Sequence, residues 1–293
     1  MIALSVLCAV LAAASNATGT VLQRRAAMDA PASDALSPRL LLDLARRPVW
    51  LGGILGVVFA AIFQALALAF GPLALVQPVF VLELPFALLI AVPVLHRTLP
   101  SAGWRAIAAM VVGLALALAA AAPHGGTPRP SWVRLVPAVV GCAGAMALLV
   151  AAARRRPFGA VRAVCLAGAS AIGNALAAML MKVSMDVLSH SGVTGFLTAW
   201  QTYGFAVAGI TAVFLLENAL QAGPLPASQP ALTLGDALVS LLLGLTVFGE
   251  HIRSGWWLLP ALTGVVLIVV GSVRLSRLDL LRAGSGGPPA PAP

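Results

Sequence analysis

Apolar runs of roughly 20 residues follow one another from one end of this chain to the other. A run of that length is long enough to cross the hydrocarbon core of a bilayer as a helix, at about 1.5 Å of rise per residue. The runs therefore predict transmembrane helices rather than strands or a soluble core. We count nine of them, over residues 2–22, 49–70, 73–95, 105–122, 132–153, 161–181, 196–220, 224–248 and 256–273.

The composition agrees with a membrane protein and excludes several other classes. Only 9% of the residues are charged, against about 25% in soluble domains, and the mean hydropathy is +1.00. The net charge of +9 does not indicate a nucleic-acid partner, because the basic residues lie at the ends of apolar runs, where they set membrane topology. Cys8, Cys142 and Cys165 lie inside apolar runs without metal-ligand spacing, so we expect neither a disulfide framework nor a zinc site.

An internal duplication is visible within these runs. The octapeptide Gly71–Pro78 has a close match in Gly223–Pro230, and adding 152 to each residue number carries one onto the other. The same shift carries Gly103-Trp104 onto Gly255-Trp256, so the register holds over 34 positions, from 71 to 104. Such repeats dictate the fold, and we therefore expect two copies of one structural unit.

The two copies extend beyond this anchor. Asn16, Arg24 and Trp50 in runs one and two resemble Asn174, Lys182 and Trp200 in runs six and seven. Runs one to four then match runs six to nine, and run five is a linker. Because matched runs lie an odd number of spans apart, the copies insert with opposite topology, as in secondary transporters. The predicted units are a first repeat at 1–122, a linker helix at 123–157, an inverted repeat at 158–275 and a disordered tail at 276–293.

Basic residues orient the chain. Fourteen of the Arg and Lys residues fall on one side of the predicted topology and four on the other, which places the larger group in the cytoplasm. The N-terminus is then outside and the C-terminus cytoplasmic, in a plasma (inner) membrane; the Arg- and Ala-rich composition is typical of a bacterial genome. The cytoplasmic connection 24–48 contains a stretch, Leu40–Arg47, that we expect to lie along the interface as an amphipathic helix.

The 4+1+4 arrangement resembles the drug/metabolite transporter superfamily. Within it, the segment Phe70–Pro78, the link Leu99–Gly103 and the pair Ala122-Pro123 are similar to the NIPA-like branch of magnesium transporters. The resemblance covers nearly the whole chain and implies a transporter. Such families often carry an acidic residue at the end of run three, where this chain has His96-Arg97, while the second copy keeps Glu250.

Two acidic residues lie near the middle of apolar runs, Glu83 in the third and Asp236 in the eighth. A carboxylate at the bilayer midplane costs roughly 2.5–3.5 kcal/mol even on lenient scales, so it normally faces a cavity or a partner. Asp236 shares a helical stripe with Gln229, Thr233 and Ser240, at spacings of i, i+4, i+7 and i+11, which predicts a cavity wall. The alternative is a protonated acid that is hydrogen-bonded to a neighbouring helix.

Other polar residues give weaker signals. Gln77 lies six residues before Glu83, about 120° from the same helical face. Asn16 and Asn174 lie among small residues, which indicates either close helix packing or contact with substrate. Prolines at 78, 85 and 230 free carbonyls that could bind a cation, or simply mark packed kinks. Lys182 and Glu250 fall at predicted outer helix ends, where a structural role is expected.

The function that these observations favour is secondary transport of a small solute or cation by alternating access. Asp236, and with it Glu83, would bind the cation or a coupling proton. Magnesium or another divalent cation is one alternative substrate, and an organic metabolite or drug is another. A membrane scaffold or enzyme subunit is the alternative from a different class, but the sequence contains no catalytic constellation or cofactor motif, so we expect no enzyme. Substrate, coupling ion, direction of transport and oligomeric state stay open.

Overall fold

The computed structural model describes residues 2–28, 48–94, 99–127, 129–223 and 225–277. Within them, nine helical segments are long and apolar enough to cross a membrane, which confirms an all-α polytopic membrane protein. The elements run in the order α1 (Ile2–Met28), α3 (Pro48–Phe70), α4 (Leu73–Val79), η2 (Phe80–Leu82), α5 (Glu83–Val94), α6 (Ser101–Ala121), β1 (His124–Gly125), α7 (Trp132–Arg154), α8 (Ala160–Thr198), α9 (Trp200–Ala222), α10 (Leu225–Thr246), β2 (Glu250–His251), η3 (Gly255–Trp257) and α11 (Leu258–Ser276).

The third predicted run is not one continuous helix. It divides into α4, a 3-10 turn (η2) and α5, and Glu83 is the first residue of α5. Pro85 accounts for the break, because its nitrogen cannot donate to the Val81 carbonyl and its ring would collide with that oxygen in a regular α-helix. The interruption therefore lies directly before the buried carboxylate.

Helix α8, the sixth span, is longer than its apolar run. The prediction ended run six at Met181, where the polar stretch after it begins, but α8 continues to Thr198 with a break at Gly192, whose φ is 65°. An apolar run ends where the chain leaves the hydrocarbon core. The helix itself continues until a residue such as Gly interrupts its backbone, so the two ends need not coincide. The fourth run also begins earlier than predicted, at Ser101.

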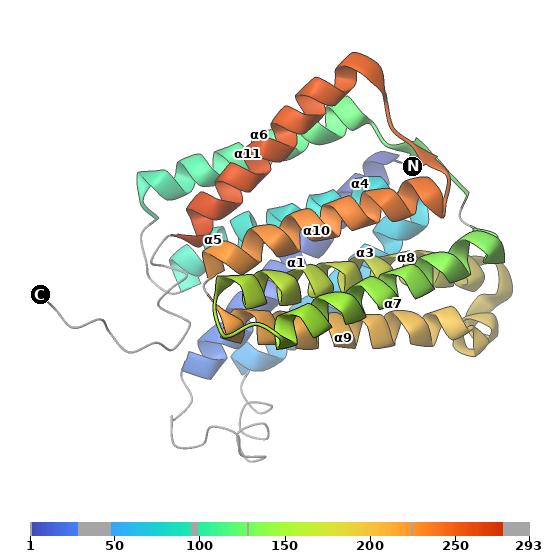
Figure 1. Ribbon diagram of the computed structural model, residues 1–293, viewed down its shortest axis with the longest axis horizontal. Helices are drawn as coiled ribbons and strands as arrows, with labels where there is room; N and C mark the ends of the chain where they lie inside the picture. The colour runs from blue at the N-terminus through green and yellow to red at the C-terminus, as the bar shows by residue number, and fades with distance from the viewer. Residues whose placement is uncertain (1, 29–47, 95–98, 128, 224, 278–293) are drawn as a thin grey trace, which may run out of the picture.

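Some expected features lie outside the described residues. These are the predicted interfacial helix at 40–47, the link at 96–98 and most of the predicted tail. A short antiparallel pair that the sequence did not predict, β1 with β2, joins the loop after α6 to the loop after α10, with Gly125 opposite Glu250. We call the end of the bundle that holds this pair and the Gly71–Pro72 turn the strand end; it lies on the right in Figure 1.

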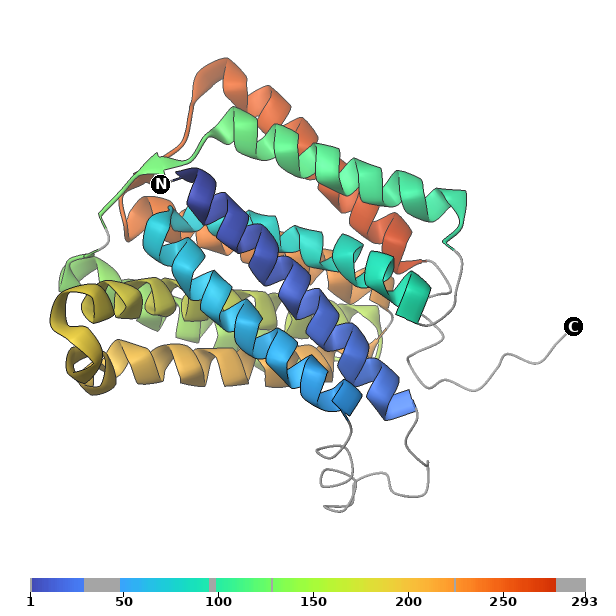
Figure 2. The same ribbon diagram turned by 180° about the vertical axis from the view of Figure 1, so that it is seen from behind.

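Helices of the two predicted repeats run in opposite directions. In Figure 1, α1 and α4–α5 run away from the strand end, whereas their counterparts α8 and α10 run toward it. Similarly, α3 and α6 run toward the strand end while α9 and α11 run away from it, as the reverse view also shows (Figure 2). The contacts match as well: α1 packs most extensively on α3, and α8 on α9. A superposition of the two sets stays a prediction.

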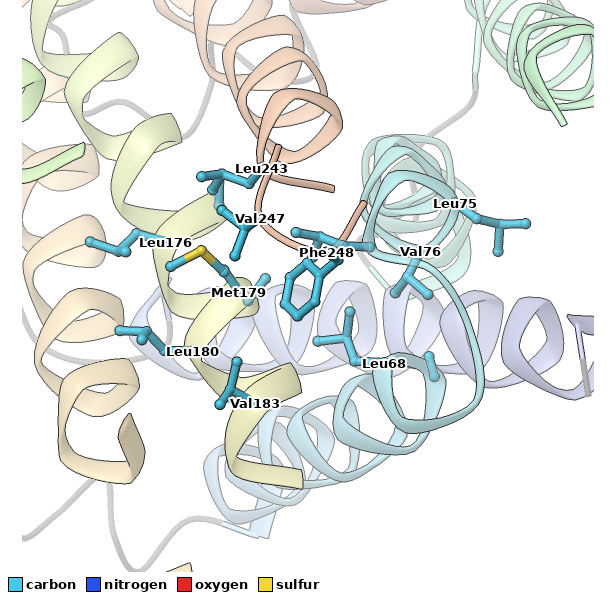
Figure 3. Close-up of a cluster of buried hydrophobic side chains, with 14 of the residues drawn as sticks. Leu68, Leu75, Val76, Leu176, Met179, Leu180, Val183, Leu243, Val247 and Phe248 are labelled. Carbon is cyan, nitrogen blue, oxygen red and sulfur yellow. The ribbon is translucent and has the colours of Figure 1, made fainter. Parts of the chain in front are cut away.

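The apolar core is concentrated near the strand end. Figure 3 shows Phe248 between Leu68 and Val76 on one side and the α8 residues Met179 and Val183 on the other. Two smaller clusters follow, one between α7, α8 and α9 and one between α5, α6 and α11. The α6 and α11 helices approach so closely that a Cβ on Gly113 would lie 2.6 Å from the Gly264 carbonyl oxygen.

Candidate functional site

A central cavity of about 800 Å³ lies between the two predicted repeats. Its walls come from α1, α3, α4–α5, α8, α9 and α10, so both halves of the chain contribute. At one limit it is lined by Gln77 and Met181, and at the other by Val92, Leu220 and Ser276, which lie near the helix ends opposite the strand end. Because α5 rises about 1.5 Å per residue, the wall from Glu83 to Val92 alone spans about 13 Å.

The 3-10 turn η2 brings two polar residues of the third span onto this cavity. In a regular helix Gln77 and Glu83 would lie about 120° apart, but each 3-10 residue turns the chain by about 120° instead of 100°. Three such residues reduce the offset to about 60°. Gln77 and Glu83 consequently both line the cavity, although the sequence placed them on different faces.

The two midplane carboxylates share the cavity. Glu83 enters it from α5 and Asp236 from α10, and they are close enough to interact electrostatically. The side chain of Asn16, on α1, lies beside Glu83 on the cavity wall. Asp236 accepts a hydrogen bond from the Ser240 hydroxyl at 3.4 Å. The arrangement places two acidic groups, each with one polar neighbour, against an open volume.

Seven of the eight predicted site residues line this cavity. They come from four of its walls, α1, α4–α5, α8 and α10: Asn16, Gln77, Glu83, Asn174, Gln229, Thr233 and Asp236. The prediction that Ser240 faces the cavity is wrong. Ser240 is fully buried one turn closer to the strand end, and it acts on Asp236 through its hydroxyl rather than on the open volume.

Three polar lining residues were not predicted from the sequence. Gln64 of α3, Thr20 of α1 and Ser276 at the end of α11 all line the cavity. A signal for Gln64 was present, since it is the lone polar side chain between Trp50 and Phe70 in an otherwise apolar run. Thr20 gave no comparable signal, because its hydroxyl donates to the Asn16 carbonyl within its own helix, as many helical threonines do.

The electrostatics of the cavity are one-sided. Among the described residues that line it, the only charged types are the carboxylates Glu83 and Asp236, with no Lys, Arg or His. Most of the remaining wall is apolar and includes Phe80 and Phe205. The described residues contain no group of three or more His, Cys, Asp or Glu side chains that could hold a metal ion. A bound cation would therefore rely on the two carboxylates and on amide oxygens.

The strand end above the cavity is filled by side chains. The prediction of a helix end is wrong for Lys182, which lies within α8, whereas Glu250 does follow the end of α10. Neither charge is solvated, since the two side chains are 10% and 0% exposed. Their charged groups are 3.5 Å apart, next to the ring of Phe248 in the apolar cluster. Lys182 is buried against Glu250, the Gly71 carbonyl oxygen and the Phe248 ring.

The fold and the cavity define a polytopic α-helical membrane protein whose two halves enclose an acidic central cavity. The chain is 31% identical over 289 residues to an uncharacterized protein of Corynebacterium glutamicum, and the alignment covers 96% of this chain and 98% of that protein. The chain belongs to the family of that protein. No family model matches the chain, and no solved structure matches it.

Proposed function

We propose that this protein is a secondary transporter of the drug/metabolite transporter type, which moves a small cationic solute by alternating access. The observation that carries the proposal is the cavity itself: both halves build it, it reaches one end of the bundle, and its only charged lining residues, among those described, are Glu83 and Asp236. Midplane carboxylates in such a position normally serve a substrate or ion path. Cavities between helix bundles of opposite direction are the usual substrate sites of these transporters.

The orientation and repeat proposed from the sequence complete this picture. With the N-terminus outside, the strand end faces the exterior and the cavity reaches the cytoplasmic end in this conformation. The opposed directions of α1 and α8, and of α3 and α9, support an inverted repeat that would exchange conformations to expose the site on the other side. The absence of a catalytic motif in the sequence favours transport over the scaffold and enzyme-subunit alternatives.

Two chemical classes of cation remain as substrates. A volume of about 800 Å³ with largely apolar walls suits an organic cation, since ligand pockets measure roughly 300–1,000 Å³. A divalent cation such as magnesium is the second candidate, because Mg²⁺ keeps several waters and needs about one or two carboxylates. The amides of Asn16 and Gln77 beside Glu83 favour that reading, as they could bind the retained waters.

Proton coupling follows from the shared cavity. Two carboxylates in one low-dielectric space cannot both be charged cheaply, so the pair would hold a proton and exchange it for the cation. We expect Asp236→Asn to abolish pH-dependent uptake into proteoliposomes, and Glu83→Gln to shift the pH optimum of uptake. The assay would compare a panel of metal and organic cations, without ATP and with or without a pH gradient.

A matched control is Glu217→Gln. Glu217 lies on α9, is exposed and does not line the cavity, so uptake should not change when its charge is removed. Pure folding defects would be identified by size-exclusion profiles of all three variants. Unchanged pH-dependent uptake by folded Asp236→Asn protein would contradict the mechanism, and no uptake of any tested cation by the unaltered protein would contradict transport of cations.

A further inference from the structure

A buried cluster of charged groups joins the two halves of the protein above the cavity. The Glu250 carboxylate, which follows α10, accepts hydrogen bonds from the backbone N–H groups of Leu73 at 2.6 Å and Ala74 at 2.9 Å. These are the first residues of α4, where the helix leaves its N–H groups without intrahelical partners. The ammonium of Lys182, on α8, lies 3.5 Å from the same carboxylate. It also donates to the Gly71 carbonyl oxygen.

The surroundings of this cluster are closely fitted. The Lys182 ammonium lies 5.2 Å from the centre of the Phe248 ring, which packs between Leu68 and Val76 on one side and Met179 and Val183 on the other (Figure 3). A side chain at Gly244 would collide with the Glu250 carboxylate. The carboxylate and the ammonium therefore both have protein partners, although a buried ion pair is a poor way to gain stability compared with apolar packing. Such charged groups are better suited to a contact that must form and break.

The hydrogen bonds of the cluster to the Gly71–Ala74 turn cross between the halves, whereas the Lys182–Glu250 ion pair lies within the second half. Gly71, Leu73 and Ala74 belong to the first predicted repeat, and Lys182 and Glu250 to the second. If the halves separated at the strand end to open the cavity there, these hydrogen bonds would have to break together. Closing the strand end would re-form them.

We propose that Lys182 and Glu250 form a latch with the Gly71–Ala74 turn that holds the strand end shut while the cavity is open at the opposite end. This inference rests on the proposed transport function, and it adds the device that sets the resting conformation. In this structure the latch is closed and the cavity reaches the opposite end, as the proposal requires.

The repeat register makes the latch one-ended. Subtracting 152 from Glu250 gives Thr98, which has no carboxylate, and adding 152 to Ala74 gives Pro226, which has no N–H group to donate. The sequence therefore cannot build the same latch at the opposite end. The two closed states are therefore not equivalent. The protein should prefer the state that is closed at the strand end, because only that state has the latch.

Sided labelling of a single cysteine tests the latch without any substrate. In a background where Cys8, Cys142 and Cys165 are replaced by alanine, Ala177→Cys puts a thiol on the cavity wall below the latch. A membrane-impermeant maleimide should label this thiol from the opposite end of the bundle and not from the strand end, in sealed vesicles of each orientation. Adding Lys182→Met or Glu250→Gln should raise the labelling rate from the strand end by about tenfold or more, because one partner of a buried pair is lost.

Arg129→Met is the matched control. It removes the ion pair between Arg129 and Asp186, which are 2.7 Å apart at the same end of the bundle. Neither residue belongs to the first repeat, so this pair does not join the two halves. Sidedness should not change in this variant. Lys182→Met is the decisive change, because Glu250 keeps its two backbone hydrogen bonds and the fold is less disturbed; thermal melting and size exclusion confirm that the protein remains folded.

The outcomes separate the latch from transport. Two results would contradict the latch: labelling from the strand end in the protein with both latch residues, or unchanged sidedness in folded Lys182→Met and Glu250→Gln proteins. Neither result would contradict the proposed cation uptake, which the proteoliposome assay tests separately. A switch of sidedness in a protein that takes up no cation would support the latch as a conformational lock and contradict the proposed transport function.

Discussion

Three acidic residues inside the bundle show how the neighbours of a carboxylate decide its role. Glu250 receives two backbone N–H groups and an ammonium ion, so its charge is balanced within the protein. Asp236 has the Ser240 hydroxyl at 3.4 Å and otherwise faces the cavity, and Glu83 has the Asn16 amide. A buried charge needs compensation, so the two cavity carboxylates are the ones left to bind a cation or a proton.

A prediction at the same scale concerns one methyl group. A Cβ on Gly264 would lie 2.6 Å from the backbone nitrogen of Ala117 on α6, which neither helix can accommodate without moving. We expect Gly264→Ala to destabilise the protein by about 1–3 kcal/mol, as overpacking does, and to lower its Tm in a thermal melt. Gly141→Ala on α7 is the control: nothing lies within 4 Å of the added atom, so Tm should be unchanged or higher. Equal Tm values for the two variants would contradict the close α6–α11 contact.

At the scale of elements, the divided third span is the feature that builds the site. A continuous helix would direct Gln77 and Glu83 to different faces, and the 3-10 turn at Phe80–Leu82 reduces that difference. Interrupted helices are tolerated at membrane depth where the freed backbone groups line a cavity or pack in protein, and Val81 is in fact buried against α6. The break thus interrupts the α-helical hydrogen bonding of the third span and places Gln77 and Glu83 on the same cavity wall.

We expect Pro85→Ala to restore the hydrogen bond to Val81 and to straighten α4–α5. The folded protein should be at least as stable, because a helix interior disfavours proline by about 3 kcal/mol relative to alanine. Uptake should nevertheless fall, since Glu83 would rotate away from Gln77. Pro137→Ala, in the linker helix α7, changes the same residue type away from the cavity and should leave uptake intact. Normal uptake with a raised Tm in Pro85→Ala would show that the break is not needed.

At the scale of the molecule, the chain combines opposed helix directions with a strong charge asymmetry. The elements of Figure 1 cross the bundle alternately, so α1 begins at the strand end and α11 ends at the opposite end. This alternation agrees with nine spans and puts the two ends of the bundle in different compartments. The basic residues then decide which compartment each end faces.

Reporter fusions check that orientation. We expect a green fluorescent protein fused after the last residue to fluoresce, and alkaline phosphatase in its place to be inactive, because the positive-inside rule puts that end in the cytoplasm. Phosphatase fused into the loop between α6 and α7, at the strand end, should be active. The reverse pattern would move the strand end to the cytoplasm and would invert the direction in which the cavity opens.

Much of the architecture follows from the sequence because a bilayer makes each span a local problem. A backbone without water must satisfy its hydrogen bonds within the helix, so roughly 20 apolar residues are enough to specify a span. The same logic predicts that Glu83 and Asp236 lie near the midplane, and the Gln229–Thr233–Asp236 stripe lines the cavity as its spacing indicated. These features depend on residues within a few turns of each other.

Only the tertiary structure decided how those spans meet. Lys182 is 111 residues from the Gly71 carbonyl it contacts, and Glu250 is 177 residues from Leu73. No local pattern distinguished them from charges at a solvated helix end, and none removed Ser240 from the cavity or added Thr20 to it. The reason is physical: helix periodicity specifies which residues share a face, whereas the packing of distant helices decides whether that face meets lipid, another helix or an open volume.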